Sequence, residues 1–304
     1  MSPDIRFISS KENLIERIGS ILIESSGTEG FKDNIVVFPG RRPAHFLRRD
    51  LAHRIKGTFK PPVILSMDEF VESACRTEGL NSPQLNALDA TAVIYEHCRA
   101  EVESFIRHSG TVFRFDDFFA WGLEIFSSFE DLKINLVSKK DLAGFDALLD
   151  DAGDFRGDFN CFAAAYENFY DWTKKNGLVT RSGRYFFLSS NLSQTLSDLK
   201  GLKNILFAGF FAFTKSEKEI LRKISALPNT RFIFQKGPGL SENLDFLGQY
   251  EKESVEQVDW RGKVRFHKAS DQHGEIFALN QSLKKMLENE KSFSSEHVIV
   301  LPDS

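Results

Sequence analysis

Cysteine is scarce in this sequence, and the three that are present match no familiar framework. Cys75, Cys98 and Cys161 are odd in number and lie far apart. They have neither the spacing of a structural zinc site nor the even count of a disulfide scaffold. Few, dispersed cysteines are typical of a reducing compartment, so we expect a cytoplasmic protein.

Targeting and membrane-spanning segments are missing as well. The first 13 residues, MSPDIRFISSKEN, have neither the basic flank nor the apolar run of a secretory signal. No stretch approaches the roughly 20 apolar residues that a membrane helix needs. We therefore expect a protein that does not enter a membrane.

A strong charge of either sign is also absent. The 304 residues carry a net charge of −4, so any contact with DNA must come from a local basic patch. Apolar residues make up 41% and charged residues 27%, which are values typical of a globular protein. Phenylalanine, by contrast, is abundant, with 30 copies, and we expect most of these rings to fill the core.

The motifs of ATP hydrolysis are not found where they belong. A phosphate-binding loop needs G-x-x-x-x-G-K-[ST] after the first strand, but the sequence there is SSKENLIERI, without glycine. Lys11 in this segment is not followed by Ser or Thr. The later apolar run NILFAGFFAF carries Gly209 where a magnesium-holding acid is expected. We predict that the chain does not hydrolyse nucleotides.

Other catalytic patterns are weak. The seven histidines are scattered, and His97 and Cys98 are adjacent on a predicted helix, where neighbouring residues do not face each other. The acid-x-Lys pattern of a nuclease occurs at residues 131–133 and 198–200. Both matches lie in helix-like or turn-like sequence and are short enough to arise by chance. We predict no catalytic residue and no metal site in this chain.

Short apolar runs alternate with amphipathic stretches at both ends of the first 258 residues. They predict strands at residues 5–8, 35–38, 63–65, 205–211 and 231–235. Strands separated by helices indicate a parallel, doubly wound α/β sheet. Between them, residues 81–200 are mostly helical in pattern and are predicted to be an insertion into a domain formed by residues 1–80 and 201–258. Two capping boxes, Ser9 with Glu12 and Thr214 with Glu217, are predicted to begin helices.

The last segment, residues 259–304, has the pattern of a βαβ unit. Its predicted strands are KVRFHKA and HVIVLP, with a helix from about Gln272 to Asn289 between them. The preceding stretch, GPGLSENLDFLGQYEKESVEQ, is polar and is predicted to be a loop at the boundary. A lone βαβ unit does not cover both of its faces. We therefore expect that the chain continues in a longer protein.

A basic cluster is the clearest binding signal. Arg41 and Arg42 lie in the loop after the second strand, and Arg48 and Arg49 lie on the following helix. Ligands of parallel sheets bind at the carboxyl ends of strands, and arginines beside a helix N-terminus suit a phosphate group. The alternative is a solvated helix face on which the arginines pair with Asp50 and nearby acids.

Several segments together resemble the N-terminal region of AddB/RexB-type proteins of bacterial DNA repair. The segments, in order, begin with VVFPGRRPAHFLRRDLA and PPVILSMDEFV and continue with SPQLNALDATAVIYEHC, FDDFFAWGLEIFSSFEDLKINLVS, NILFAGFFAFTKSEKEIL, HGEIFALNQSLKK and HVIVLPD. Such proteins have a superfamily 1 helicase-like front half and a PD-(D/E)XK nuclease at the C-terminus. The resemblance implies a RecA-like (P-loop-NTPase-like) parallel sheet, here lacking the P-loop, with a mainly helical insertion and the start of a second RecA-like domain.

The resemblance also implies a function. It is that of a non-catalytic DNA-binding or scaffolding region of a double-strand-break-repair helicase–nuclease, with a partner subunit of the AddA type. In helicases of this superfamily the loop after the second strand touches single-stranded DNA, which points to Pro39, Gly40, Arg41 and Arg42. The nuclease with its Mg²⁺, and the iron–sulfur cluster of some members, are expected beyond Ser304. The alternatives are an ATP-dependent motor or nucleotide-processing enzyme with an unrecognised phosphate loop, and a purely structural partner-docking domain.

Overall fold

The structure of the protein is a computed structural model, which places two compact units in residues 1–256 and 257–304. It describes residues 3–26, 31–106, 114–143, 159–248, 266–269, 271–290, 292 and 298–299.

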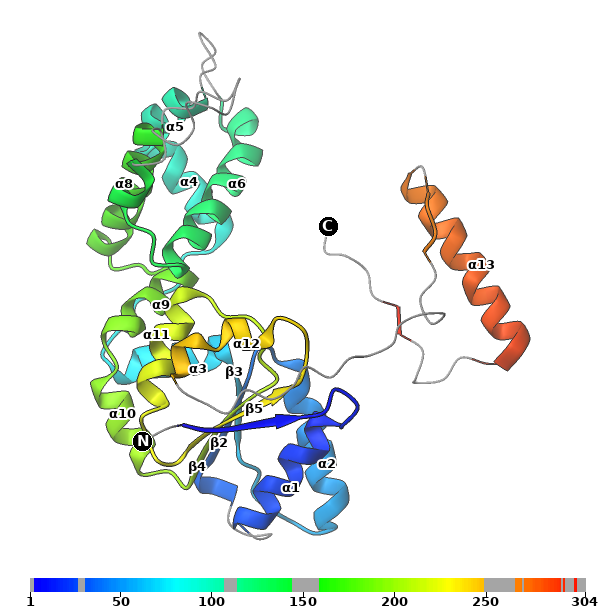
Figure 1. Ribbon diagram of the computed structural model, residues 1–304. Helices are drawn as coiled ribbons and strands as arrows, with labels where there is room; N and C mark the ends of the chain where they lie inside the picture. Colours follow the sequence, from blue (N-terminus) through cyan, green and yellow to red (C-terminus); the bar gives the residue numbers. More distant parts are fainter. Residues whose placement is uncertain are drawn as a thin grey trace. The chain divides into compact units, whose positions relative to one another are not determined.

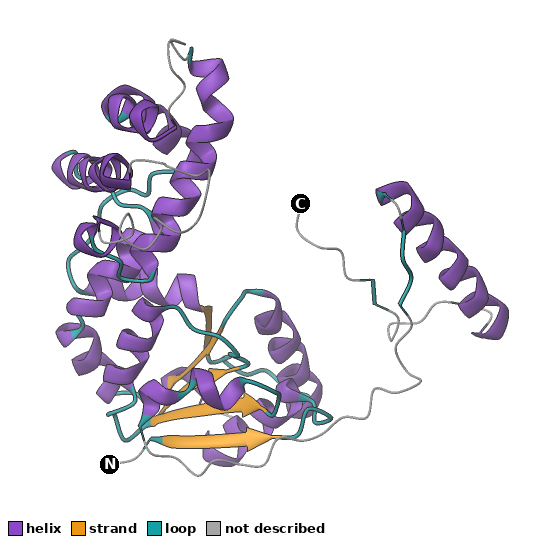
Figure 2. Ribbon diagram, turned by 45° about the horizontal axis from the view of Figure 1, so that its top comes forward, coloured by secondary structure: helices purple, strands orange, loops and turns teal. Residues whose placement is uncertain are grey.

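The first unit is built on a five-stranded sheet whose strands all run parallel (Figures 1 and 2). The strands are β1 (Asp4–Ile8), β2 (Asn34–Phe38), β3 (Val63–Ser66), β4 (Asn204–Ala208) and β5 (Thr230–Gln235). Their order across the sheet is β1-β5-β4-β2-β3. The predicted parallel α/β sheet is therefore confirmed, and the fold is consistent with a RecA-like domain carrying helical insertions.

The strand β4 lies in the middle of the sheet, between β5 and β2, and all five of its residues are buried. A strand covered on both faces needs apolar side chains in both directions, which explains its unbroken apolar sequence. The strand ends at Ala208, earlier than the predicted residue 211. Gly209 has a φ of +75°, a left-handed conformation that turns the chain out of the sheet at this point.

Helices cover both faces of the sheet and make a three-layer architecture. One face carries α1 (Leu14–Ser26) and α2 (Arg42–Ile55), which share a core that includes Ile18, Leu22 and Leu47. The core on the other face takes most of its helical side chains from α3 (Met67–Thr77), α9 (Arg181–Ser190), α10 (Ser193–Lys200) and α11 (Lys215–Ile224). α2 is the helix that the sequence predicts after the second strand.

The middle of the chain forms a helical part with its own core. Its helices are α4 (Ala87–His97), α5 (Arg99–Ile106), α6 (Phe115–Ile134), α7 (Lys139–Ala143) and α8 (Phe159–Lys175). Rings fill this core, among them the fully buried Phe129 and Phe169, as the abundance of phenylalanine predicts. In Figure 1, α9 lies between these helices and the sheet, and it contacts α3, α6 and α11.

The helical insertion is predicted to end at residue 200, but the core of the sheet already includes side chains of α9 and α10, before that residue. Tyr185 and Leu188 of α9, with Leu199 of α10, pack in the core of the sheet and not in that of the helical part. The helical pattern of residues 181–200 carries no information about which core a helix joins. Sequence periodicity therefore marked the helices but not their assignment.

Of the two predicted capping boxes, one begins a helix and the other does not. Thr214 and Glu217 form the predicted reciprocal capping box of α11. The prediction for Ser9 and Glu12 is wrong: α1 begins at Leu14, and the Asn13 side chain accepts from the amides of Ile15 and Glu16 at 3.0 and 3.4 Å. Asparagine directly before the apolar stripe is the better N-cap, since its side chain reaches the first free amides.

The segment predicted as a polar boundary loop is partly ordered against the sheet. It contains α12 (Leu240–Asn243) and the 3₁₀ helix η3 (Asp245–Leu247). Leu240, Leu244 and Leu247 are buried in the core beside α11. Their spacing of four and three residues is that of one helix face, so three leucines outweigh the polar residues around them. The remaining short element of this unit is η1 (Phe31–Asp33).

In the second unit the structure describes one long helix, α13 (Gln272–Glu290), as predicted. The strands predicted on either side are not formed at residues 266–269 and 298–299, and their other residues lie outside the described ones. Ile276 and Phe277 of α13 are 66% and 63% exposed.

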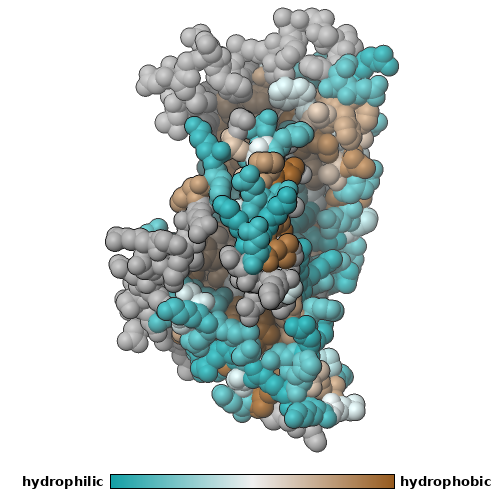
Figure 3. Space-filling view, turned by 90° about the vertical axis from the view of Figure 1, so that its right-hand side faces the viewer, coloured by the Kyte–Doolittle hydropathy of each residue, from teal (hydrophilic) through white to brown (hydrophobic). Residues whose placement is uncertain are grey.

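The surface of the described residues is mostly hydrophilic in the view of Figure 3, with small apolar patches between the polar side chains. Phe115 and Trp121 of α6 are among the exposed apolar residues, at 38% and 47%. Among the described helices, none combines the length and the apolar character required to cross a membrane.

Candidate nucleic-acid interface

The loop from Pro39 to Arg41 lies at the carboxyl edge of the sheet. It follows β2, which pairs with β3 on one side and β4 on the other. Pro39 and Gly40 are exposed, and a Cβ built on Gly40 meets nothing within 4 Å. The helix α2 starts at Arg42, with Pro43 in its first turn and no side chain capping its N-terminus. Pro43 has no N–H and the Ala44 amide donates to the Arg41 carbonyl at 3.2 Å, so an anion at this end of the helix would be bound mainly by the arginine side chains.

One exposed line on α2 combines positive charge with an aromatic ring. Arg42, Phe46 and Arg49 are spaced by four and three residues, so they lie on one face of the helix. Phe46 is 51% exposed, and the Arg49 guanidinium carbon lies 5.6 Å from its ring centroid. Sequence analysis named both arginines but not Phe46. The available signal in the sequence was the spacing of Phe46, which lies four residues after Arg42 and three before Arg49.

A groove of about 390 Å³ runs beside this line, between α2 and the start of α1. It is lined by Asn13, Ile15, Glu16, Phe46, Arg49, Asp50 and His53. The groove therefore places an exposed ring and a guanidinium together on an open surface. This combination suits stacking of a base and contact with a phosphate.

Arg41 pairs with α3 instead, and the charge of Arg48 also acts on the same helix, at Glu69. The Nε atom of Arg41 lies 3.1 Å from Oε1 of Glu69, and the Arg41 side chain is 78% exposed. Hydrogen bonds from the backbone and side chain of Ser66, then the charges of Arg41 and Arg48, lower the pKa of Glu69. Because Glu69 is ionised, it neutralises part of the charge on this side of the loop.

The alternative, in which the arginines pair with Asp50 and nearby acids, holds for Arg41, which pairs with Glu69, and for Arg54. The Nε atom of Arg54 lies 2.9 Å from Asp50 Oδ2, and both side chains are less than one third exposed. Arg42, Arg48 and Arg49 make no ion pair within the described part of the chain. From Pro39 to Lys56 the sequence has six Lys and Arg residues and a single acid, Asp50. A net basic surface therefore remains after the internal pairs are counted.

The loop after β1 is where a phosphate-binding loop would stand. Its backbone donors bond to its own side chains: the Ser9 amide donates to Glu12 Oε1 at 3.0 Å, and the Lys11 amide to Ser9 Oγ at 3.2 Å. A phosphate cradle needs such amides to point at the ligand. The geometry therefore agrees with the missing glycines of the sequence.

A polar cluster at the end of β3 escaped sequence analysis. Asp68 accepts from Arg181 Nε at 2.9 Å and from the Tyr185 hydroxyl at 2.6 Å, and the Arg181 guanidinium lies over the Tyr185 ring. Burial, followed by the hydrogen bond to Asp68, raises the pKa of Tyr185. The nearby Glu217 carboxyl has a raised pKa, chiefly through burial. More than 100 residues separate Asp68 from its partners, so no local pattern could reveal the cluster.

The weak catalytic candidates are separated by the fold. Burial raises the pKa of the Cys98 thiol to about 12, and His97 stacks on Trp172 at 5.0 Å instead of facing the cysteine. Lys133 and Lys200 of the acid-x-Lys matches lie on helices α6 and α10, where residues two apart point in different directions. The described residues contain no group of three His, Cys, Asp or Glu side chains placed to hold a metal.

Comparison with protein-family models and with curated proteins gives no match for this chain.

Proposed function

We propose that this chain is the non-catalytic, helicase-like DNA-binding and scaffolding region of a DNA double-strand-break-repair helicase–nuclease. One observation carries the proposal: an exposed, uncapped helix N-terminus with unpaired arginines at the carboxyl edge of an all-parallel sheet. The residues that contact DNA in this proposal are Pro39, Gly40, Arg41, Arg42, Arg48 and Arg49, to which the geometry adds Phe46.

The proposed ligand is the backbone of single-stranded DNA. The Arg42 side chain at the start of α2 binds one phosphate, and Arg49 binds a second farther along the helix. The Phe46 ring between them offers a face to an unstacked base. Duplex DNA keeps its bases stacked, so this ring favours a single strand.

Arg41 contributes less to binding than Arg42 in this proposal. Its guanidinium already pairs with Glu69, and a phosphate must compete with that carboxylate. The pair is exposed, so its own contribution to stability is small, about 1 kcal/mol or less. Arg42 has no such competitor among the described residues.

Fluorescence anisotropy with labelled single-stranded oligonucleotides at several salt concentrations tests the proposal. Replacing Arg41 and Arg42 by alanine is expected to weaken binding for every sequence and to reduce the salt slope by roughly 0.7 per lost contact. Arg76→Ala is the matched control, since Arg76 is exposed and pairs with Glu72 on α3 away from the loop. The single variant Arg42→Ala is expected to lose more affinity than Arg41→Ala.

Two results contradict the DNA-binding part. One is a wild-type chain that binds no oligonucleotide at low salt, and the other is a double variant with wild-type affinity and slope. In the first case the partner-docking alternative gains support.

The same proposal includes a motor subunit of the AddA type, because the loop after β1 has no phosphate-binding sequence. Stable co-purification of the two chains tests that part.

A further inference from the structure

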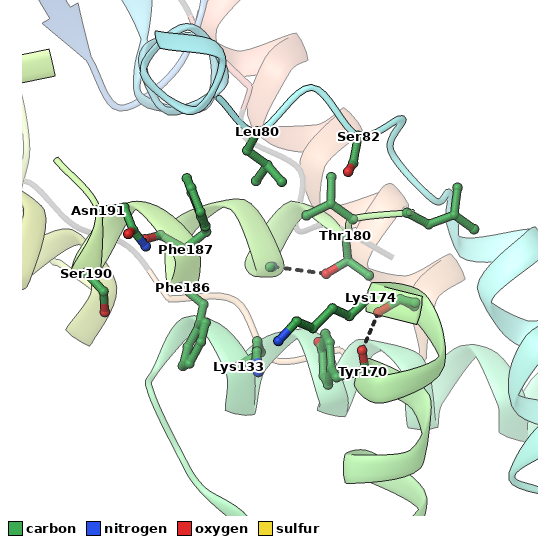
Figure 4. A pocket seen from close by; sticks show the side chains of 14 residues that line it. Leu80, Ser82, Lys133, Tyr170, Lys174, Thr180, Phe186, Phe187, Ser190 and Asn191 are labelled. Atoms are coloured by element: carbon green, nitrogen blue, oxygen red, sulfur yellow. Dashed lines mark hydrogen bonds between the residues drawn. The ribbon is translucent and has the colours of Figure 1, made fainter. Parts of the chain in front are cut away.

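A cavity of about 430 Å³ opens among α6, α8, α9 and the segment that follows α3 (Figure 4). It shares no residue with the arginine-rich edge of the sheet. Most of its wall is apolar, and the side chains responsible are Leu80, Leu178, Val179, Phe186 and Phe187. This volume and this lining are those of a site for a small organic molecule.

Two lysines, Lys133 of α6 and Lys174 of α8, line the same cavity (Figure 4). The Nζ atom of Lys133 lies 3.8 Å from the ring centroid of Phe186 and 4.5 Å from that of Tyr170. Within the described residues, neither lysine side chain makes an ion pair or a hydrogen bond. Two ammonium groups therefore face an apolar cavity with no anion between them.

Burial is the main cause of a lowered pKa at Lys133, opposed by the charge of Asp171 and assisted by that of Lys174. The aromatic faces offset part of the lost hydration of the ammonium group. Rings accept no strong hydrogen bond, so the three N–H donors of Lys133 remain available. An anion at this position would satisfy those donors and relieve the repulsion between the two lysines.

The wall of the cavity is fixed before any ligand arrives. The Tyr170 hydroxyl lies 3.1 Å from the Phe129 carbonyl oxygen and 3.0 Å from Ser182 Oγ. The Glu130 carboxylate accepts from the Ser182 amide at 3.0 Å and from the Tyr170 hydroxyl at 3.1 Å. These bonds tie α6, α8 and α9 together, so binding does not require ordering of the aromatic wall.

Three other polar side chains of the wall already make hydrogen bonds. Thr180 Oγ1 accepts from the Gly183 amide at 3.0 Å, Thr173 donates to the Tyr170 carbonyl at 2.9 Å, and Asn191 donates to the Phe187 carbonyl at 2.9 Å. A nucleobase needs partners for the polar atoms along its edge, and leaving them buried without partners is costly. Besides the Ser82 and Ser190 hydroxyls, the lining offers a ligand mainly positive charge and apolar surface.

We propose that this cavity binds a flat, singly charged organic anion, such as an aromatic carboxylate or sulfonate. Its charge lies between Lys133 and Lys174, and its apolar body packs against Phe186, Phe187 and Leu80. The site goes beyond DNA binding and depends on none of the arginines at the sheet edge.

The experiment compares two fluorescent probes that share one ring system. 1-Anilinonaphthalene-8-sulfonate carries the negative charge, and N-phenyl-1-naphthylamine lacks it. Each is titrated into the full chain, and one saturable site for the sulfonate is expected. Lys133→Met keeps the length of the side chain and removes the charge, so sulfonate affinity is expected to fall about tenfold or more while affinity for the neutral probe is kept.

Three further variants locate the effect. Lys174→Met is expected to weaken sulfonate binding less, because Lys174 is more exposed than Lys133. Lys175→Met is the matched control, since Lys175 is the next residue on α8 and does not line the cavity. Lys133→Arg restores the positive charge and is expected to regain most of the affinity. Near-ultraviolet circular dichroism of each variant tests whether tertiary packing is intact. If Lys133→Met does not fold, the difference in sulfonate affinity between Lys174→Met and Lys175→Met decides whether the lysines bind the anion.

The proposal is overturned if the wild type binds no sulfonate probe, or if Lys133→Met or Lys174→Met binds it as tightly as Lys175→Met. Equal affinity for the charged and the neutral probe overturns it as well, because the lysines then play no part. Displacement of the probe by a deoxynucleoside monophosphate, but not by naphthalene-1-sulfonate, assigns the cavity to a nucleotide and rejects the apolar anion.

Discussion

Replacing Gly209 by alanine is expected to destabilise the sheet through the backbone. Gly209 ends the central strand β4 with a φ of +75°, and a Cβ at this position would lie 3.0 Å from Leu14 Cδ2. The left-handed conformation costs a residue with a Cβ about 1–2 kcal/mol. The contact with the flexible end of Leu14 adds less than ~1 kcal/mol, since that side chain is able to move. The sum is a loss of about 1–3 kcal/mol in the free energy of unfolding.

The matched control is Gly40→Ala in the loop after the neighbouring strand β2. No atom lies within 4 Å of the Cβ position at Gly40, and its φ is not in the left-handed region. Alanine there removes freedom from the unfolded chain and is expected to be neutral or to stabilise by about 0.4–1 kcal/mol. Urea unfolding followed by far-ultraviolet circular dichroism measures both changes. If Gly209→Ala unfolds at the same urea concentration as the wild type, the turn after β4 does not require glycine, and the reasoning fails.

Two further changes test the helical core and the loop edge. Phe129 is fully buried among rings of α6 and α8, so Phe129→Ala is expected to cost about 3–5 kcal/mol, whereas Trp121→Ala, at a site 47% exposed, costs far less in the same urea assay. Ser66, Arg41 and Arg48 lower the pKa of Glu69 in the folded protein. The ionised carboxylate therefore stabilises the fold at pH values above the ordinary glutamate pKa of about 4.3. This stabilisation is lost as the pH falls through the pKa of Glu69 in the folded protein. Glu69→Gln is therefore expected to flatten the acid side of a plot of unfolding free energy against pH, and an unchanged acid side would show that the ionised form has no role.

The sheet was predictable because its determinants are local. Each strand is a short apolar run between turn residues, and the helices that connect them show one apolar stripe each. The parallel arrangement follows from the alternation of strands and helices. Two local signals were available but not used: the S-x-x-E pattern of Ser66 and Glu69, which forms a full capping box, and the spacing of Leu240, Leu244 and Leu247.

The candidate sites were predictable only in part, for a physical reason. The loop from Pro39 to Arg42 was found because parallel topology fixes where the end of a strand lies. Which arginine stays unpaired depends on acids brought in by the fold, such as Glu69 from α3. The cavity around Lys133 depends on the packing of three helices, and nothing in the local sequence marks this lysine except a chance match to a nuclease pattern.

The donors and charges at this edge of the sheet are arranged differently from those of a phosphate-binding loop. A phosphate-binding loop holds a compact, highly charged ligand by surrounding it with backbone amides. Here the amides after β1 bond to Ser9 and Glu12, and the chain after β4 turns at Gly209, so neither place offers a cradle or a metal-holding acid. Free charge lies instead on side chains of one helix, spread along its length at Arg42 and Arg49. Charges spaced along a helix match a polymer of phosphates better than a single triphosphate, and this match supports the proposal that DNA is the ligand of this edge.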